Sequence, residues 1–399
     1  ISFKNTKLLV PGVNRLFSLK SKEIYIESIE PVLKYLNSKR KPRKLSLMGS
    51  NGRKYSYLLK GNEDLRQDER VVQLMLLMNE LLKNASNYDN LTMKITTFHV
   101  LPLSYNCGII SWLENSDPIF ELVKNQREQK GISANCEKKL LSTLCENYDM
   151  LSKLKKLELF LQIQDHIKAD ELKKVLWLQS SKAETWTSRR QAFIGSTAVM
   201  SIIGYILGLG DRHLMNIMLE KNSGRIVHID FGDCFESASL RDKLPEKVPF
   251  RLTRLLVNAM DVCGTEGTFK STCEIVMKTM RENKEVILAL LEEFICDPII
   301  SWRLGNETLS ESGTDISNSS IQVDKIIDNS LKSITIEDSF KNEGVIETEV
   351  KIQLIQKQLI KKDDKNSMDN RAYEALVKVK NKLNGKEFSG EELDHKAQV

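Results

Sequence analysis

The sequence predicts an α+β fold of two lobes, a small β-rich lobe followed by a larger and mostly helical one. Residues 44–48 and 54–60 alternate apolar and polar side chains with the period of a strand, and an Asn-Gly pair between them signals a tight hairpin. Residues 64–83 then place an apolar stripe at helical spacing, with acidic residues in the first turn. From about residue 117 the pattern is helical up to Gly210. Strands with one helix, followed by a long helical region, make the two lobes.

The boundaries of the lobes follow from these patterns. We expect an N-terminal segment at residues 1–23, the small lobe at 24–112 and the large lobe at 113–399. Residues 306–344 are rich in Ser, Thr, Asn and Asp with few apolar side chains, which predicts a disordered insert. Further strands are expected at residues 32–36, 92–101, 108–113, 216–220 and 225–230. Further helices are expected between residues 251 and 296 and at 349–362 and 371–383, the last ended by Gly385.

The bulk composition indicates a globular chain and excludes several classes. The 399 residues suit two or three structural units, and 41% hydrophobic residues with mixed charge indicate a folded core. The net charge of +5 is scattered, so we expect no nucleic-acid partner, since that needs a broad basic face. The seven cysteines include no CxxC pair, which indicates the reduced thiols of a cytosolic protein rather than a zinc site or a disulfide framework.

One uncharged stretch, residues 192–210, is long enough to span a bilayer. Because it contains Ser and Thr side chains and four glycines, and leads directly into a charged triplet, we expect a buried core helix and no membrane span. The chain begins with Ile1 rather than Met and shows no signal peptide, so we expect a fragment of a longer protein.

Two motifs in the large lobe carry chemistry. Residues 208–216 read GLGDRHLMN and residues 228–232 read HIDFG. Ordinary protein kinases place H-R-D-x-x-x-x-N ahead of D-F-G. Here the triplet is reversed, yet Asp211 and Asn216 keep the five-residue step between a catalytic Asp and a metal-binding Asn, and Asp230 keeps the second metal ligand. Taken singly these residues fit a helix-ending turn or a core position; taken together they predict phosphoryl transfer with magnesium.

A second group of residues surrounds the end of the strand at 54–60. A kinase lysine at such a strand end contacts the α- and β-phosphates of ATP and is ordered by a nearby acid, which makes Lys60 the candidate. The candidate orienting acids are Glu63, Asp64 and Asp68. Solvated charges at a helix N-terminus are the alternative, and the neighbouring motifs favour the functional role.

The loop that would hold the terminal phosphate is not a familiar one. Neither a Walker-A nor a G-x-G-x-x-G pattern is present. Residues 37–40 (NSKR) lie between the first two predicted strands, and the hydroxyl of Ser38 with nearby backbone N–H groups could hold the phosphate. An ordinary solvated loop is the alternative.

Long motifs of the chain resemble one known family. Residues 60–70 (KGNEDLRQDER), 204–216 (GYILGLGDRHLMN) and 228–236 (HIDFGDCFE) are similar to the phosphatidylinositol-3-kinase-related protein kinases, which have a bilobal, PI3/PI4-kinase-type fold. The stretches at 42–52 (PRKLSLMGSNG) and 245–254 (PEKVPFRLTR) favour the target-of-rapamycin branch of this family. The resemblance covers nearly the whole chain and implies an ATP-dependent serine/threonine protein kinase that acts in nutrient and growth signalling.

The resemblance also implies a role for each matching position. The residues that would line the ATP site are Leu36, Leu58, Lys60, Glu63, Asp68, Ile110, Trp112, Leu113, Met218 and Ile229. In it Trp112 would stack on the adenine and Leu113 would offer backbone hydrogen bonds. The residues that would act on the acceptor hydroxyl are Asp211 and His213. Those that would hold Mg²⁺, with Mn²⁺ as an alternative, are Asn216 and Asp230.

The resemblance leads to further expectations outside the active site. Phe98 stands where the family usually has Tyr, which should change inhibitor contacts more than catalysis.

Residues 126–163 resemble inserted helices that dock a small WD-repeat β-propeller subunit, and the scaffold subunits of the family's complexes would be further partners. Residues 306–344 coincide with a variable regulatory loop that could be phosphorylated, or with a solvated spacer, which we favour. We expect the rapamycin-binding bundle and the C-terminal tail domain to be absent, and a cytoplasmic location with association to endomembranes through the complex.

Two alternatives to a protein kinase follow from the same residues. A lipid kinase of the same fold needs a basic activation loop to bind clustered phosphates. Between residues 233 and 250 four acids offset three bases, so the sequence favours a protein hydroxyl over an inositol phosphate. A pseudokinase would lack one of four residues that are all present here, namely Lys60, Asp211, Asn216 and Asp230. A fragment that is weakly active without its tail is the related alternative.

Overall fold

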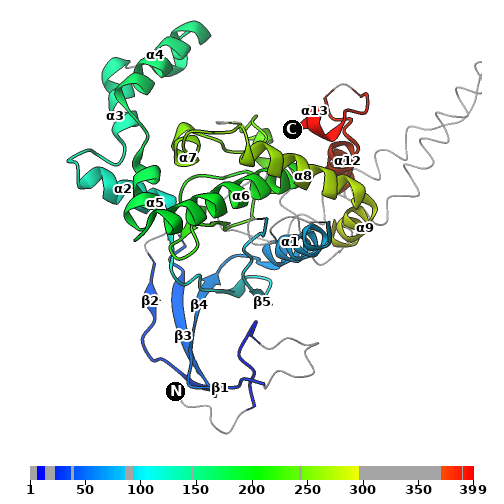
Figure 1. Ribbon diagram of the computed structural model, residues 1–399. Helices are drawn as coiled ribbons and strands as arrows, with labels where there is room; N and C mark the ends of the chain where they lie inside the picture. Colours follow the sequence, from blue (N-terminus) through cyan, green and yellow to red (C-terminus); the bar gives the residue numbers. More distant parts are fainter. Residues whose placement is uncertain are drawn as a thin grey trace, which may run out of the picture. The chain divides into compact units, whose positions relative to one another are not determined.

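The computed structural model (Figure 1) describes residues 7–13, 23–36, 40–85, 93–145, 147–241, 245–295, 370–388 and 390–399. Internal contacts divide the chain into two compact units, Ile1–Gly305 with Arg371–Val399 and Asn306–Asn370. The second unit, apart from Asn370, lies outside the described residues, and so do the predicted insert at 306–344 and the predicted helix at 349–362.

An antiparallel sheet of six strands forms the N-terminal part of the chain. Its strands are β1 (Ile26–Ile29), β2 (Lys34–Tyr35), β3 (Arg43–Gly49), β4 (Lys54–Gly61), β5 (Val100–Ser104) and β6 (Cys107–Ser111). The order is β1-β3-β4-β6-β5, and β2 also pairs with β3. The predicted hairpin is formed by β3 and β4, with Gly52 of its turn at a φ of +72°, a conformation that glycine adopts without strain.

Cross-strand pairing gives this sheet two different faces, because directly paired residues point to the same side. Tyr57 and Ile109 are buried in a core cluster on one face. Lys44 pairs with Leu58, and Leu58 pairs with Ile110, so these three side chains lie side by side on the other face. Leu58 and Ile110 are only half-buried, and this second face therefore offers an apolar surface to a ligand.

The strand predicted at 92–101 is wrong for most of its length, since β5 begins only at Val100. The cause is Asn79 in helix α1 (Arg66–Ala85), which follows β4. Its amide nitrogen donates to Ile95 O at 2.9 Å, and its amide oxygen accepts from Ile95 N at 2.8 Å. These two bonds use the backbone groups that a strand ladder would need.

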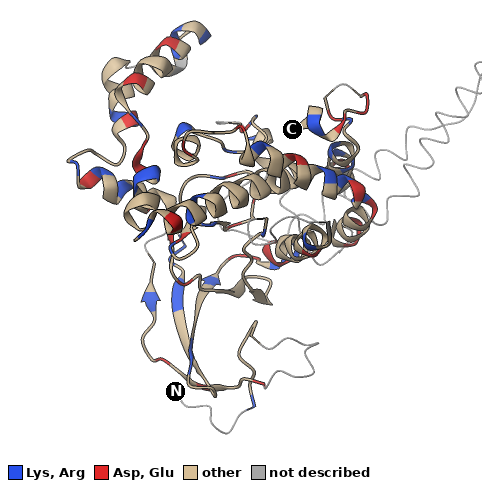
Figure 2. Cartoon of the chain, in the orientation of Figure 1, with Lys and Arg blue, Asp and Glu red and all other residues tan. Residues whose placement is uncertain are grey.

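Helices dominate the chain after the sheet, with basic and acidic residues interspersed along them (Figure 2). The helices are α2 (Ile119–Glu128), α3 (Cys136–Leu144), α4 (Lys153–His166), α5 (Glu171–Leu178), α6 (Ala183–Leu207), α7 (Arg254–Ala259), α8 (Thr268–Glu282), α9 (Lys284–Ile295), α12 (Asn370–Asn384) and α13 (His395–Gln398), with the 3₁₀ turns η1 (Tyr148–Met150) and η2 (Ser237–Leu240). The hairpin predicted between 216 and 230 belongs to a second antiparallel sheet of β7 (Ser116–Pro118), β8 (Ile217–Glu220) and β9 (Ile226–His228).

Helix α6 is the buried core helix predicted at 192–210. Every residue from Phe193 to Leu207 is buried, and the helix ends at Gly208, which has a left-handed φ of +58°. In the part of the chain that the structure describes, α6 alone has the length and apolar composition to cross a membrane, but 83% of its most apolar window is covered by the protein. Its carboxyl end leads directly into the reversed kinase triplet.

Candidate active site

A cavity of about 560 Å³ brings together residues from four separate segments of the chain. Its lining residues are Arg40, Pro42, Lys60, Gly61, Glu63, Asp211, His213, Asp230, Gly232 and Asp233. The predicted phosphate-binding lysine, the predicted catalytic pair and one predicted metal ligand therefore share one space.

Lys60 lies at the end of β4 and is held by two carboxylates. Its Nζ lies 3.5 Å from Glu63 Oε1 and 4.0 Å from Asp230 Oδ2. The other oxygen of Glu63 lies 3.0 Å from Arg40 Nη1. The side chains of Lys60 and Glu63 are 14% and 8% exposed, so this pair is largely formed before a ligand arrives. The predicted role of Glu63 as an orienting acid fits this geometry.

Asp68 and Gln67, in the first turn of α1, hold the backbone of the D-F-G segment. Asp68 Oδ1 accepts the Phe231 N–H at 2.9 Å, and Gln67 Nε2 donates to the oxygens of Phe231 and Gly232 at 3.0 and 2.9 Å. Burial raises the pKa of the Asp68 carboxyl to about 6, and the charge of Lys60 opposes this rise. Asp68 thus links the Lys60 side of the site to the Asp230 side.

Asp64, the third candidate for orienting Lys60, has another role. Its Oδ1 accepts the Arg66 N–H at 3.0 Å, and its Oδ2 lies 2.6 Å from Arg66 Nη2. The carboxylate therefore stabilises the start of α1 by a local bond to a backbone N–H of the first turn. The candidate role of Asp64 in orienting Lys60 stays a prediction.

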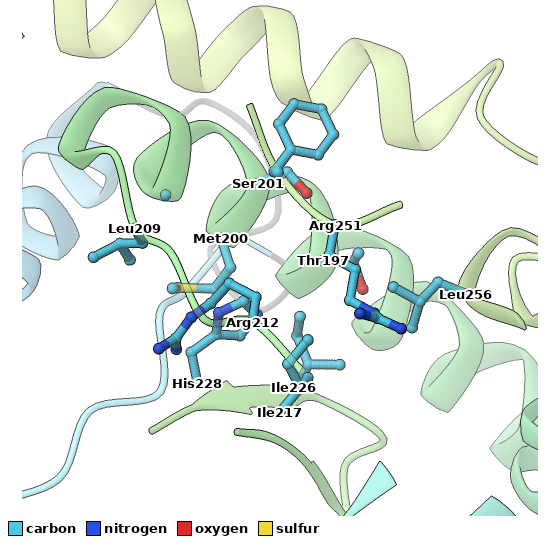
Figure 3. Close-up of a pocket in the computed structure, with 12 residues that line it drawn as sticks. Thr197, Met200, Ser201, Leu209, Arg212, Ile217, Ile226, His228, Arg251 and Leu256 are labelled. Carbon is cyan, nitrogen blue, oxygen red and sulfur yellow. The ribbon is translucent and has the colours of Figure 1, made fainter. Parts of the chain in front are cut away.

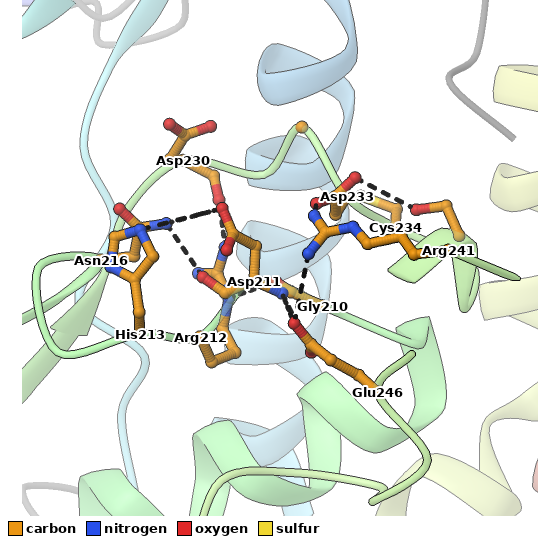
Figure 4. A network of polar contacts seen from close by, with 12 residues as sticks. Gly210, Asp211, Arg212, His213, Asn216, Asp230, Asp233, Cys234, Arg241 and Glu246 are labelled. Carbon is orange, nitrogen blue, oxygen red and sulfur yellow. Dashed lines mark hydrogen bonds and ion pairs between the residues drawn. The ribbon is translucent and has the colours of Figure 1, made fainter. Parts of the chain in front are cut away.

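Asp211, His213 and Asn216 lie together at the end of α6 (Figure 4). Asn216 Nδ2 donates to Asp211 O at 2.9 Å and to Asp211 Oδ2 at 3.4 Å. His213 Nε2 lies 3.9 Å from Asp211 Oδ2, while His213 Nδ1 accepts the Met215 N–H at 3.2 Å. A neutral imidazole that accepts at Nδ1 carries its proton at Nε2, which faces the Asp211 carboxylate.

Arg212, between the two predicted catalytic residues, is buried and bonded to backbone oxygens. It donates to Gly210 O at 2.7 Å, to Ile229 O at 2.9 Å and also to Asp230 O. It therefore joins the segment that carries Asp211 to the segment that carries Asp230. Burial lowers the pKa of its guanidinium, and the nearby aspartates act in the opposite sense.

The predicted adenine-binding residues share one property, which is partial burial of an apolar side chain. These residues are Leu36, Leu58, Ile110, Trp112, Leu113, Met218 and Ile229. A group of apolar side chains that remain partly exposed in the folded chain is suited to a planar ligand. The Trp112 ring also lies under Lys44, whose Nζ is 4.0 Å from the ring centroid. Ser38 lies outside the described residues.

The two predicted metal ligands offer hard oxygen atoms, as Mg²⁺ requires. The side chain of Asp230 is 43% exposed, and the bond from Asn216 Nδ2 to Asp211 leaves the amide oxygen of Asn216 to act as the acceptor. Within the described residues no group of three or more His, Cys, Asp or Glu could hold a metal. A site of one carboxylate and one amide fits Mg²⁺, which takes most of its ligands from water and phosphate.

A sequence model of the family described as "Phosphatidylinositol 3- and 4-kinase" matches residues 54–304. The chain belongs to this family. "Serine/threonine-protein kinase TOR" of Oryza sativa subsp. japonica is 41% identical over 97% of this chain and 15% of its own length. "Serine/threonine-protein kinase mTor" of Drosophila melanogaster is 45% identical over 78% and 13%, and "Serine/threonine-protein kinase TOR2" of Saccharomyces cerevisiae is 40% identical over 97% and 15%. The chain spans about one seventh of the length of these relatives, and the predicted resemblance is confirmed.

Two solved structures show the same fold. "Structure of the open conformation of CtTel1" matches with a TM-score of 0.70 at 23% identity, over 99% of this chain and 14% of that chain. "FAT and kinase domain of CtTel1" matches with a TM-score of 0.66 at 24% identity, over 91% and 22%. The predicted α+β, PI3/PI4-kinase-type fold, with its β-rich N-terminal part and helical remainder, is confirmed.

Sequence reasoning missed several residues that hold the site together. Arg40 contacts Glu63, and Glu246 accepts the Asp211 N–H at 3.1 Å from each carboxylate oxygen. Arg212 donates to backbone oxygens of the segments that carry Asp211 and Asp230. No local spacing in the sequence marks contacts of this kind.

Lys44 was also missed, although the sequence holds a signal for it. The Asn-Gly turn sets the register of the hairpin, and in that register Lys44 pairs directly with Leu58. Directly paired residues point to the same side of a sheet, so Lys44 lies beside a predicted adenine contact. The register of the predicted hairpin could therefore have placed Lys44 at the site.

A smaller cavity of about 20 Å³ lies under the catalytic segment (Figure 3). Met200, Leu209, Arg212 and His228 are among its lining residues. Burial lowers the pKa of His228 to about 3, and the charge of Arg212 acts in the same direction. This imidazole is therefore neutral at physiological pH, and a cavity of about 20 Å³ is too small for a nucleotide.

Proposed function

We propose that the chain transfers the γ-phosphoryl group of ATP to a serine or threonine hydroxyl of a protein, as in nutrient and growth signalling by the kinases it resembles. The relatives carry the name serine/threonine-protein kinase. The observation that carries the proposal is that Lys60, Asp211, His213 and Asp230 line one cavity, although they come from segments far apart in the sequence. Such convergence suits phosphoryl transfer, because its catalysis consists mainly of positioning and charge stabilisation.

The chain's own residues divide the work as follows. Lys60, ordered by Glu63, binds the phosphates, and Asp211 accepts or orients the proton of the acceptor hydroxyl. The Nε2–H of His213 stabilises the charge that develops beside Asp211. Asn216 and Asp230 would hold Mg²⁺, which would neutralise negative charge on the phosphates. Mn²⁺ offers similar oxygen chemistry as an alternative.

The charges of the activation loop favour a protein acceptor over a lipid one. Arg241 pairs with Asp233 and lies 3.6 Å from Glu246 Oε1. Of the loop residues that the structure describes between 233 and 250, this leaves Lys247 as the base that could contact an inositol phosphate. Lys247 by itself does not form the cluster of cations that a phosphorylated headgroup needs, and Lys243 lies outside the described residues. A phosphoinositide remains the second candidate, because the family description includes lipid kinases.

An apolar surface on α4 supports the proposed docking of a WD-repeat β-propeller subunit at residues 126–163. Helix α4 has no buried residue, and Leu154, Leu157, Phe160 and Leu161 are all at least half exposed. Large apolar side chains gathered on one exposed helix are typical of a protein interface. The proposal includes further scaffold subunits and a cytoplasmic location with endomembrane association through them.

Transfer of labelled phosphate from ATP–Mg²⁺ tests the proposed function. The chain is offered a Ser/Thr substrate protein and, separately, phosphoinositide vesicles, with the Asp230→Ala variant as the blank. Label on the protein alone supports the proposal. Label on the lipid alone overturns the argument from the activation loop. Absence of transfer to either acceptor, also after addition of the propeller subunit, would contradict a catalytic role for the chain.

A further inference from the structure

Lys382 is a buried lysine that the proposed chemistry does not use. It lies in α12, and only 3% of its surface is exposed. Its Nζ lies 2.5 Å from Glu236 Oε1, donates to Tyr205 O at 2.8 Å and lies 4.9 Å from the centroid of the Tyr205 ring. Lysine is almost never fully buried unless it is paired. Both partners of this lysine belong to segments that lead to the reactive residues.

The two partners flank a place where two backbone segments are hydrogen-bonded, Leu207–Gly208 with Phe235–Glu236, which we call the joint. Tyr205 lies in the last turn of α6, and Glu236 immediately precedes η2. Between them Phe235 N–H donates to Leu207 O at 2.8 Å, and Glu236 N–H donates to Gly208 O at 2.9 Å. A Cβ at Gly208 would lie 2.6 Å from Glu236 N, so the two backbone segments approach as closely as glycine allows.

One segment of the joint continues to Asp211, and the other follows Asp230 in the chain. Gly210 N–H donates to Asp233 O at 3.0 Å, and Asp211 N–H donates to the Glu246 carboxylate at 3.1 Å from each oxygen (Figure 4). The segment after Asp230 is therefore bonded to the segment before Asp211 at successive points. A displacement of the joint changes the position of Asp211 relative to Asp230.

We infer that Lys382 is a positioning residue for phosphoryl transfer: it holds the end of α6 against Glu236 and so fixes Asp211 relative to Asp230. The inference deepens the proposed function and rests on it for its kinetic readout. Lys378, one turn before Lys382 in α12, also holds Glu236: its Nζ lies 3.1 Å from Glu236 Oε2, and its side chain is 43% exposed. Lys382 acts through the backbone and touches neither ATP nor the acceptor.

The kinetic test is the Lys382→Met variant, with Lys380→Met as its matched control on an exposed position of the same helix. We expect kcat of Lys382→Met to fall about a hundredfold, the effect of a misplacement on the order of 1 Å. KM for ATP stays within about twofold, because Lys60 and the predicted adenine contacts Leu58 and Ile110 lie on β4 and β6 and not on the segments that Lys382 joins. Lys380→Met retains both constants. A wild-type kcat in Lys382→Met overturns the inference.

A second variant separates positioning from support of the fold. Lys382→Met leaves Glu236 without its closer partner, which lowers stability as well as activity. The double variant Lys382→Met/Glu236→Gln also removes the charge that Lys382 neutralised. We expect its melting temperature to return towards that of the wild type while kcat stays low. Recovery of kcat together with the melting temperature would show that Lys382 only supports the fold.

Hydrogen exchange tests the joint without any need for catalysis. The amides of Gly210, Asp211, Phe235 and Glu236 should exchange at least about tenfold faster in Lys382→Met, because each is bonded within the joint or close to it. They should exchange at the wild-type rate in Lys380→Met. Unchanged exchange in Lys382→Met contradicts the inference. Absence of phosphate transfer by the wild type, by contrast, overturns the proposed function and leaves the joint to be judged by exchange.

Discussion

The two sides of the cavity differ in how far their charged residues are exposed. On the side formed by β4 and α1, the side chains of Lys60 and Glu63 are 14% and 8% exposed, and Asp68 is buried. On the other side, Asp211, His213 and Asp230 are 40%, 53% and 43% exposed. The first side is ordered by its own ion pairs. The second side keeps its polar atoms available for metal and acceptor, and depends on buried neighbours to hold its backbone.

The largest expected effect belongs to the exposed side. Asp230→Asn removes the charge of a proposed metal ligand but keeps its shape, and turnover should fall by about a thousandfold or more. Because the side chain is 43% exposed and its pairing with Lys60 spans 4.0 Å, the free energy of unfolding should change by less than about 1 kcal/mol. Steady-state kinetics and urea unfolding of the same sample measure both quantities. A large loss of stability would contradict the division between the two sides.

The next effect concerns the buried neighbours. Arg212→Met removes the guanidinium donors to three backbone oxygens around a buried side chain and should lower the free energy of unfolding by about 3 kcal/mol. Arg241→Met, at a 40% exposed ion pair, should cost less than about 1 kcal/mol. Urea unfolding midpoints compare the two variants. Equal costs would mean that Arg212 does not hold the catalytic segment.

The free energy of unfolding should decrease at acid pH because of the pairing at Glu236. Burial alone would raise the pKa of Glu236, but its bonds and charge interactions with Lys382 and Lys378 lower it below the ordinary 4.5. The stabilisation is therefore complete above about pH 4.5 and is lost as the pH falls through the lowered value. Unfolding measured from pH 6 downwards, at about half-unit steps, should show a smaller acid loss in Lys382→Met than in the wild type. Identical pH profiles of the wild type and Lys382→Met would exclude the Lys382–Glu236 pair as a source of the acid-dependent loss of stability.

The smallest effect is expected at Phe98, where the family usually has Tyr. Its ring stacks on Phe231 with centroids 6.1 Å apart and an angle of 8° between the planes. Phe98→Tyr adds a hydroxyl at the edge of this stack, so kcat and KM for ATP should each change by less than about threefold. Inhibitors that accept a hydrogen bond from a phenol should gain affinity. A tenfold loss of kcat would show that the stack is part of the catalytic geometry.

The sequence predicts those parts of the molecule that depend on neighbouring residues along the chain. The hairpin of β3 and β4, the core helix α6 and the spacing of Asp211, Asn216 and Asp230 are local patterns. The strand at 92–101 was wrong because Asn79, distant in sequence, takes the backbone groups of Ile95. The ion pair between Asp64 and Arg66 was not predicted, because a local ion pair and a charge aimed into a cleft look alike in a sequence.

The residues that hold the site could not be predicted for a related reason. Gln67 bonds to the D-F-G backbone more than 160 residues away, and Lys382, which follows the second unit in sequence, contacts Glu236. Each is a polar residue whose sequence neighbourhood suggests a solvated helix face. Their burial follows from tertiary packing, which no periodicity encodes.

The Asp211→Asn variant separates nucleotide binding from phosphate transfer in the cavity. Binding of ATP–Mg²⁺ and single-turnover transfer to a Ser/Thr substrate protein are measured side by side in the wild type and in this variant. We expect nucleotide affinity to stay within about threefold, because Lys60 and the predicted adenine contacts are unchanged, while the transfer rate falls by at least about a thousandfold. A variant that binds ATP–Mg²⁺ and still transfers phosphate at the wild-type rate would contradict the assignment of this cavity as the catalytic centre.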